Sequence, residues 1–197
     1  AQATIANNAD NRIITGGSGV NLNGESLLTF DGNVLLVASN SYNILEMRAD
    51  ENNDGGNDDN ILKFTHDGTF RAEMRYDQSS STLELSTSDN RGDLVIDSNG
   101  NMGLGITPSA HSTTSSLVKS LQIGTVTNLY NESSDDYTIL GNNIYYNGTN
   151  NKRIKAQECS RLMMNAGELT FQRAGADSAD SNITFSTVCS LSGSQSK

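Results

Sequence analysis

Alternation of apolar and polar side chains is the feature that most restricts the fold of this chain. In the segment LKFTHDGTFRAEMRY, residues 62–76, the positions from 70 to 76 alternate between apolar and charged residues. A period of two is typical of a half-buried β-strand. Between this strand and the one before it, Asp67-Gly68 readily adopts the positive φ angles of a tight turn. The segment therefore predicts a β-hairpin with Gly68 at φ > 0.

Units of the same kind recur along the chain, and no long stretch shows the spacing of an amphipathic helix. Further turns are predicted at Asp31-Gly32, Asn99-Gly100, Asn147-Gly148 and Ala166-Gly167. Further strands are predicted at residues 44–47, 83–85, 117–123 and 183–188. Gly148, like Gly68, is expected at φ > 0. The pattern predicts an all-β fold built from hairpins.

The composition bears on how such strands could form a core. Only 35% of the residues are hydrophobic, Trp is absent, and Asn, Ser, Thr and Gly together account for 84 of 197 residues. A compact monomer carries about 45–50% apolar residues, glycine included. Disorder is disfavoured because it usually comes with abundant Pro and high charge, whereas this chain has one Pro and 18% charged residues. We expect thin β-structure that completes its core with other copies; the alternative is a β-sandwich with a polar surface.

Charge and hydropathy exclude two classes of partner. The net charge of −10, with scattered Lys and Arg, predicts no binding to nucleic acid. The longest apolar run, residues 34–38, is too short to span a bilayer, so no membrane insertion is expected. Cys159 and Cys189 belong to no CxxC motif, and we expect two reduced, buried thiols, with one disulfide as the alternative.

The clearest candidate for metal binding is the acidic segment DENNDGGNDD, residues 50–59. Asp50, Asn52 and Asp54, followed by glycine, match the start of a calcium loop, and Asp58 could add another oxygen. The position where a bidentate Glu is required is Ile61, and no helices flank the segment. The alternative is a solvated acidic turn without a cofactor.

A segment rich in glycine, DSNGNMGLGITPSA at residues 97–110, could be a phosphate loop or a joint. The glycine order is the reverse of a dinucleotide fingerprint, and no apolar helical stripe follows, so the phosphate hypothesis fails.

Several segments resemble parts of bacteriophage tail fibres, especially those of marine phages and cyanophages. The segments are NMGLGITPSA followed by LVKSLQIG, NNADNRIITG with LNGESLLTFDGNVL, NNIYYNGTNNKRI, and FQRAGADSADSNITFS. The resemblance implies an elongated, intertwined homotrimeric fibre built from short β-hairpins and small β modules. It implies a structural virion protein without catalysis, located on the phage tail and therefore extracellular in the free particle. The implied partners are other tail proteins and a host-surface glycan or protein.

The same resemblance makes residues 98–110 a joint between an N-terminal hairpin module, 1–97, and a second β module, 111–197. Gly103 and Gly105 would permit close backbone approach where several chains crowd an axis, and Pro108 would end the strand. Two other functions stay open: a capsid fibre or decoration protein, and a tailspike glycan hydrolase with paired carboxylates.

Receptor contact in a fibre of this type is expected from loops held by rigid sheets. The segments YNESSDDY and NNIYYNG combine tyrosine rings, which offer apolar faces to sugars, with short polar side chains that bind hydroxyls. The candidate receptor-binding residues are Tyr130, Asp135, Asp136, Tyr137 and Tyr145. The alternative is that Tyr145 and its neighbour Tyr146 are ordinary strand residues, one facing inward and one outward.

Overall fold

The regular elements of the computed structural model are β-strands throughout the part of the chain that it describes. The described residues are 5–6, 12–16, 22–49, 58–87, 92–111, 118–132 and 137–192. They form a four-stranded, an eleven-stranded and a two-stranded sheet and contain no helix. The expected all-β fold is confirmed. The chain separates into two compact units, Ala1–Met47 and Arg48–Lys197.

The N-terminal unit is a small mixed sheet around one long strand. Its strands are β1 (Ile5–Ala6), β2 (Arg12–Gly16), β3 (Leu22–Phe30) and β4 (Leu35–Val37). β3 pairs with β1 in parallel and with β2 and β4 antiparallel. In the β3–β4 turn, the carboxylate of Asp31 accepts hydrogen bonds from the backbone N–H groups of Asn33 and Val34, and Gly32 has φ 96°. The turn predicted at Asp31-Gly32 is therefore confirmed.

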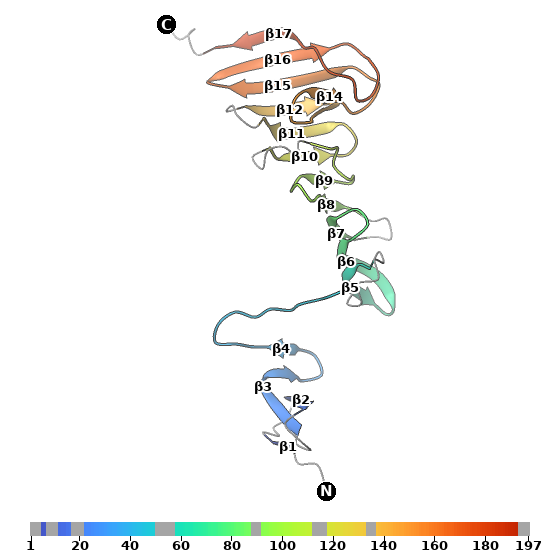
Figure 1. Cartoon of the computed structure of the whole chain (residues 1–197), viewed down its shortest axis with the longest axis vertical. Coiled ribbons are helices and arrows are strands. Elements are labelled where there is room, and N and C mark those ends of the chain that lie inside the picture. The colour runs from blue at the N-terminus through green and yellow to red at the C-terminus, as the bar shows by residue number, and fades with distance from the viewer. Residues whose placement is uncertain are drawn as a thin grey trace. The chain divides into compact units, whose positions relative to one another are not determined.

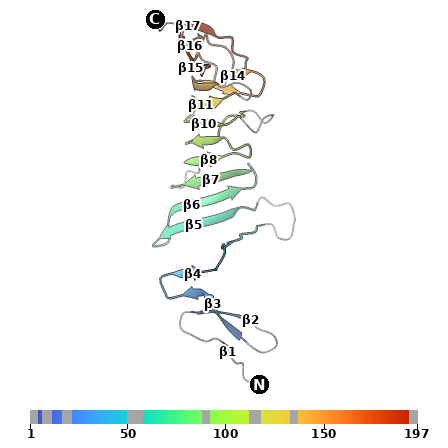
Figure 2. The same ribbon diagram turned by 90° about the vertical axis from the view of Figure 1, so that its left-hand side faces the viewer.

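The C-terminal unit is dominated by the eleven-stranded sheet, whose strands follow one another in chain order (Figures 1 and 2). The strands are β5 (Asn60–His66), β6 (Thr69–Asp77), β7 (Thr82–Ser86), β8 (Leu94–Ile96), β9 (Met102–Leu104), β10 (Ser120–Ile123), β11 (Thr127–Asn131), β12 (Thr138–Asn142), β15 (Cys159–Asn165), β16 (Glu168–Ala174) and β17 (Ser186–Leu191). β9 and β10 pair in parallel; the other neighbours are antiparallel. Between β12 and β15 the chain forms a separate hairpin of β13 (Ile144–Tyr146) and β14 (Asn151–Arg153).

Tight turns with positive φ angles join many of these strands. Asp67 and Gly68 have φ 50° and 74°, and Ala166 and Gly167 have φ 48° and 81°. Gly148, in the β13–β14 turn, has φ 95°. The positive φ angles predicted for Gly68 and Gly148 are confirmed. The two-residue turn at Asp67-Gly68 requires this backbone conformation, whereas Gly148 lies in the four-residue loop between Tyr146 and Asn151.

The segment 98–110 contains β9 and continues the sheet. A Cβ atom on Gly103 would lie 2.0 Å from the carbonyl oxygen of Ile106, so the predicted close approach occurs within a single chain. Gly105 has φ 68°, and Pro108 is buried. β8, β9 and β10 are neighbours in one sheet. The division of the chain into two modules at this segment stays a prediction.

One predicted strand is wrong, and the strands predicted to begin at residues 117 and 183 begin three residues later, at Ser120 and Ser186. Residues Ile44–Met47 are not a strand, and Ile44 and Leu45 are 74% and 81% exposed. A strand needs a hydrogen-bonded neighbour, and none of the described segments pairs with these residues. β17 begins at Ser186 because Ile183 packs against the core, with its N–H bonded to the carbonyl of Asn151.

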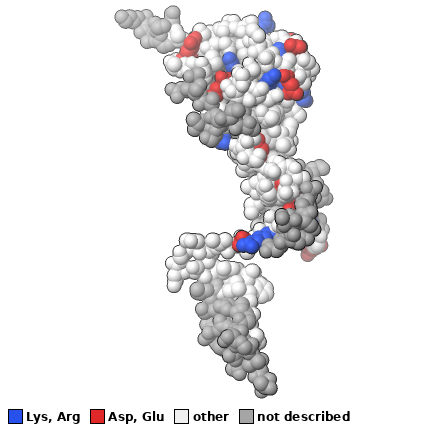
Figure 3. Space-filling model, viewed as in Figure 1, with Lys and Arg blue, Asp and Glu red and all other residues white. Residues whose placement is uncertain are grey.

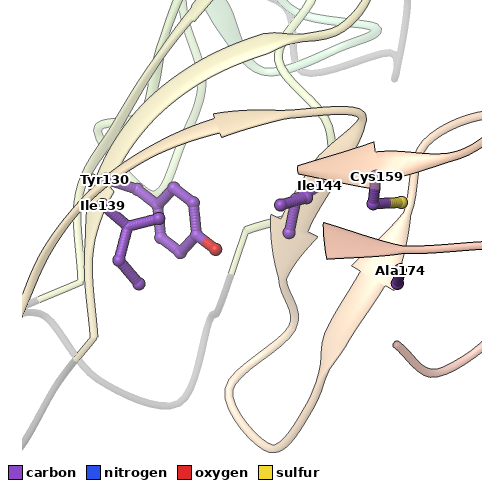
Figure 4. Close-up of a cluster of buried hydrophobic side chains, with 5 residues drawn as sticks. All are labelled: Tyr130, Ile139, Ile144, Cys159 and Ala174. Atoms are coloured by element: carbon purple, nitrogen blue, oxygen red, sulfur yellow. The ribbon is translucent and has the colours of Figure 1, made fainter. Parts of the chain in front are cut away.

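A small hydrophobic core lies where the β13–β14 hairpin packs against one face of the sheet (Figure 4). Its buried members are Tyr130, Ile139, Ile144, Cys159 and Ala174. The side-chain amide of Asn128 on β11 donates to the carbonyl of Ile144 at 2.6 Å, which ties the hairpin to the sheet. The hairpin covers one face of the sheet here, and the opposite face carries the features described next.

Candidate functional site

The eleven-stranded sheet carries an unbroken row of apolar side chains from β6 to β16. Its members are successive cross-strand partners: Tyr76, Leu83, Ile96, Met102, Leu121, Leu129, Leu140, Leu162 and Phe171. Residues directly opposite each other on adjacent strands point to the same face. The row therefore crosses nine strands on a single face of the sheet.

A second apolar row doubles the width of the first. On β5 to β10 it consists of Leu62, Met74, Leu85, Leu94, Leu104 and Ile123. On β15 to β17 it lies on the other side of the first row and consists of Met164, Leu169 and Leu191. Strands in a sheet are twisted relative to one another, so a band of constant direction runs obliquely across them. For this reason the second row lies on one side of the first row at β5 to β10 and on the other side at β15 to β17. We call these eighteen side chains the apolar stripe.

None of the described segments covers the apolar stripe. Thirteen of its eighteen side chains leave between 37% and 68% of their area exposed. Together they expose roughly 1,000 Å² of apolar surface, whereas the largest patch on a soluble monomer is usually a few hundred Å². In the space-filling view of Figure 3, Lys, Arg, Asp and Glu lie in small groups on a described surface that is otherwise uncharged. The stripe has the properties of an unpaired interface.

On the other face of the first strands, a buried arginine lies among carboxylates. Arg75 on β6 is 2% exposed and donates hydrogen bonds to Glu84 at 2.7 Å, Asp77 at 3.0 Å and Asp59 at 3.2 Å. Burial lowers the pKa of Arg75, but the hydrogen bond to Glu84 and the neighbouring negative charges raise it above its ordinary value. This network is a structural clamp that joins β6 and β7 to the segment before β5.

His111 lies in the core next to two of the predicted receptor residues. It is fully buried, and its ring centroid is 5.3 Å from that of Tyr130 and 6.0 Å from that of Tyr145. Burial lowers its pKa to about 4, so the imidazole is neutral at pH 7. Its Nδ1 accepts the backbone N–H of Tyr146 at 3.4 Å, which leaves Nε2 as the protonated nitrogen. The neighbours of His111 are aromatic rings and Asn128, so this histidine is a core residue.

The structure places the predicted receptor residues in different environments. Tyr130 is 2% exposed, and its hydroxyl donates to Asn151 at 2.7 Å, so it offers no ring face to a sugar. Burial raises its pKa. Tyr137 is half-buried against the core. Asp135 and Asp136 lie outside the described residues.

Tyr145 is half-buried on β13, and its hydroxyl donates to Asp180 at 2.8 Å. Burial, followed by the hydrogen bond and charge of Asp180, raises the pKa of Tyr145 to about 12. Both Tyr145 and Tyr146 are half-buried strand residues, and Tyr146 packs against the core. The contribution of Tyr145 to receptor contact stays a prediction.

The predicted calcium loop falls largely outside the described part of the chain. Asp50, Asn52 and Asp54 lie outside it, and Asp58 is exposed. Within the described ranges, no group of three or more His, Cys, Asp or Glu side chains is placed to hold a metal ion. The calcium site stays a prediction.

The two thiols are free and differ in exposure. Cys159 is buried, as expected, but Cys189 is exposed, so the expectation that both are buried is wrong for Cys189. Cys189 pairs with Phe171 across β16 and β17 and therefore lies on the face of the apolar stripe.

Comparison of the chain with protein-family models, with curated proteins and with solved structures finds no match. None of the described residues belong to a helix with the length and hydrophobicity needed to cross a bilayer.

Sequence patterns alone did not reveal the apolar stripe as a unit. Each strand contributes one or two members, and the strands are separated by turns, by the β13–β14 hairpin and by segments of different length. Alternation within a strand indicates two faces, but only the register between strands shows that the apolar faces join into one band.

Proposed function

We propose that this chain is a structural, non-catalytic protein of a phage tail fibre, and that three copies associate along the apolar stripe and contribute to host attachment. The observation that carries the proposal is the unbroken register of apolar side chains across the sheet. The resemblance of several sequence segments to phage tail fibres supports the virion location and the number of copies.

The stripe favours copies of the same chain as its partner. Eleven strands span about 50 Å at a spacing of about 4.8 Å, and a partner must present an apolar band of equal length. A second copy of the chain presents an apolar band of equal length because its sequence is the same. Soluble oligomers are also mostly homo-oligomers with closed symmetry. The seven buried hydrophobic residues among the described ones form too small a core for an independent unit of this size.

The free energy gained by covering the apolar stripe is large. Covering roughly 1,000 Å² of apolar area at about 25 cal/mol per Å² corresponds to about 25 kcal/mol per chain as an upper estimate. Association and side-chain ordering offset part of this. The free energy of burial that remains after these costs stabilises an assembly far more than the small core stabilises one chain.

The mass of the particle in solution tests the assembly. Light scattering coupled to gel filtration is expected to give three times the chain mass of 21.1 kDa. Leu140→Asp places a charge in the middle of the stripe and is expected to give monomers or aggregates. Thr149→Asp, at an exposed position of the β13–β14 turn, adds the same charge away from the stripe and should leave the trimer intact. A wild-type particle of the mass of one chain would refute the proposal.

Attachment and the absence of catalysis are tested separately. Purified protein added to host cells before phage is expected to slow adsorption. Incubation with host polysaccharide is expected to release no oligosaccharide, and release would favour the tailspike hydrolase. A trimer that neither binds cells nor slows adsorption would make this segment a spacer within the fibre.

A further inference from the structure

The sequence contains three Asn-Gly pairs, Asn23-Gly24, Asn99-Gly100 and Asn147-Gly148, and this pair can convert to aspartate without an enzyme. In this deamidation the backbone nitrogen of glycine attacks the side-chain carbonyl carbon, Cγ, of asparagine; its proton passes to water and ammonia leaves. Water then opens the resulting five-membered succinimide to aspartate or to isoaspartate, in which the main chain runs through Cγ. Glycine favours the attack because it has no side chain to hinder it.

Hydrogen bonds hold the backbone of the first two pairs. The N–H of Gly100 donates to the carbonyl of Asp97 at 2.9 Å, so this nitrogen cannot turn toward Cγ of Asn99 unless the bond opens. The carbonyl of Asn99 also accepts the ammonium of Lys119. Asn23-Gly24 lies within β3, which pairs with β1 and β2. The fold therefore protects both pairs from deamidation.

The third pair, in the loop of the β13–β14 hairpin, is held in a different way. Asn147 is exposed, and no hydrogen bond joins the N–H of Gly148 to another residue in the described ranges. The side-chain oxygen of Asn147 accepts the N–H groups of Thr149 at 3.1 Å and Asn150 at 2.9 Å. These donors polarise the carbonyl at Cγ and stabilise the negative charge that develops on its oxygen during the attack.

We propose that Asn147 is a site of spontaneous modification, which converts to aspartate and isoaspartate in the folded protein while Asn99 is protected. The nucleophile is the nitrogen of Gly148, the electrophile is Cγ of Asn147, and water is the other reactant. Each event replaces a neutral amide by a carboxylate and makes the chain more acidic by one charge. The reaction needs only the β13–β14 loop and is independent of the proposed assembly.

The two products have different effects on the hairpin. Aspartate leaves the main chain unchanged, and its carboxylate accepts the same two N–H groups as the amide oxygen. Isoaspartate adds a methylene to the main chain and displaces the oxygen that holds Thr149 and Asn150. Asn151, the next residue, accepts the hydroxyl of Tyr130 at 2.7 Å. The isoaspartyl product therefore loosens the hairpin that covers the small core.

Peptide mapping by mass spectrometry, after incubation of the full chain at neutral pH, tests the site. Asn147 is expected to deamidate about fivefold or more faster than Asn99, because the hydrogen bond of Gly100 must open first. In concentrated urea this bond is lost, and the two rates should become similar. Asn147→Gln, which would have to close a less favourable six-membered ring, should remove most of the acidic species seen by ion exchange, whereas the control Asn99→Gln should retain it.

Equal rates at Asn147 and Asn99 in the folded protein, or an undiminished acidic species in Asn147→Gln, would overturn the assignment of the site. The effect on the hairpin is tested with the isoaspartyl form, separated by ion exchange. It is expected to melt at a lower temperature than Asn147→Asp, which carries the same charge on an unchanged main chain. Equal melting temperatures would overturn the effect on the hairpin.

Discussion

Adjacent residues of β12 offer a direct comparison between the core of the single chain and the apolar stripe. Ile139 is fully buried under the β13–β14 hairpin, whereas Leu140, the next residue, points to the opposite face and is 48% exposed. In an isolated chain, Ile139→Ala should lower the free energy of unfolding by about 2–5 kcal/mol. Leu140→Ala should cost much less than Ile139→Ala, because about half of the leucine is already in water.

The proposed assembly changes the expectation for Leu140. The exposed half of its side chain is roughly 80 Å², and covering it at about 25 cal/mol per Å² contributes about 2 kcal/mol per chain. Three equivalent copies therefore lose about 6 kcal/mol per trimer in Leu140→Ala, in addition to the cost within each chain.

Chemical unfolding at several protein concentrations measures this difference. Because a trimer gains stability from mass action, its unfolding midpoint should rise with concentration. Leu140→Ala should lower the midpoint most at low concentration and shift the gel-filtration profile toward monomer, whereas Ile139→Ala should lower it without first dissociating the assembly. An unfolding midpoint that is independent of concentration, with Leu140→Ala close to wild type, would refute the argument.

Three further outcomes follow from the structure. Gly68→Ala places a side chain at φ 74° and should cost about 1 kcal/mol, read as a lower melting temperature; an unchanged melting temperature would contradict the turn assignment. Burial lowers the pKa of His111 to about 4, so the unfolded chain binds a proton that the folded chain does not between about pH 6.5 and 4. The free energy of unfolding should therefore fall by about 3 kcal/mol as the pH drops through this window; urea titrations of wild type and His111→Gln should differ in this slope, and parallel curves would exclude it. Arg75→Met leaves Asp77 and Glu84 without their counter-charge and should cost about 3–5 kcal/mol at pH 7 by the same assay; a neutral effect would show that the network adds no stability.

Local features of the sequence determined the fold class and many of its turns. The alternation before Tyr76 and the pair Asp67-Gly68 predicted the β5–β6 hairpin correctly. A turn depends on the φ preferences of its own residues, and a half-buried strand depends on side chains two positions apart. Both requirements lie within one short segment, so they can be seen without the rest of the chain.

The wrong prediction at Ile44–Met47 and the burial of Tyr130 show where this local information ends. Ile44–Met47 has the apolar content of a strand but no neighbour with which to pair. Tyr130 has the composition of a binding loop around it, but the β13–β14 hairpin, which lies further along the chain, covers its ring. Whether a side chain is covered depends on segments distant in the sequence.

The apolar stripe was decided by tertiary structure alone. Leu140, Leu162 and Phe171 are neighbours because three strands pair in one register, and a shift of one residue would turn each strand over and break the band. The sequence determines that each strand has an apolar and a polar face, since side chains alternate along an extended backbone. Only the hydrogen bonds between strands decide which faces align, and therefore where a surface for assembly arises.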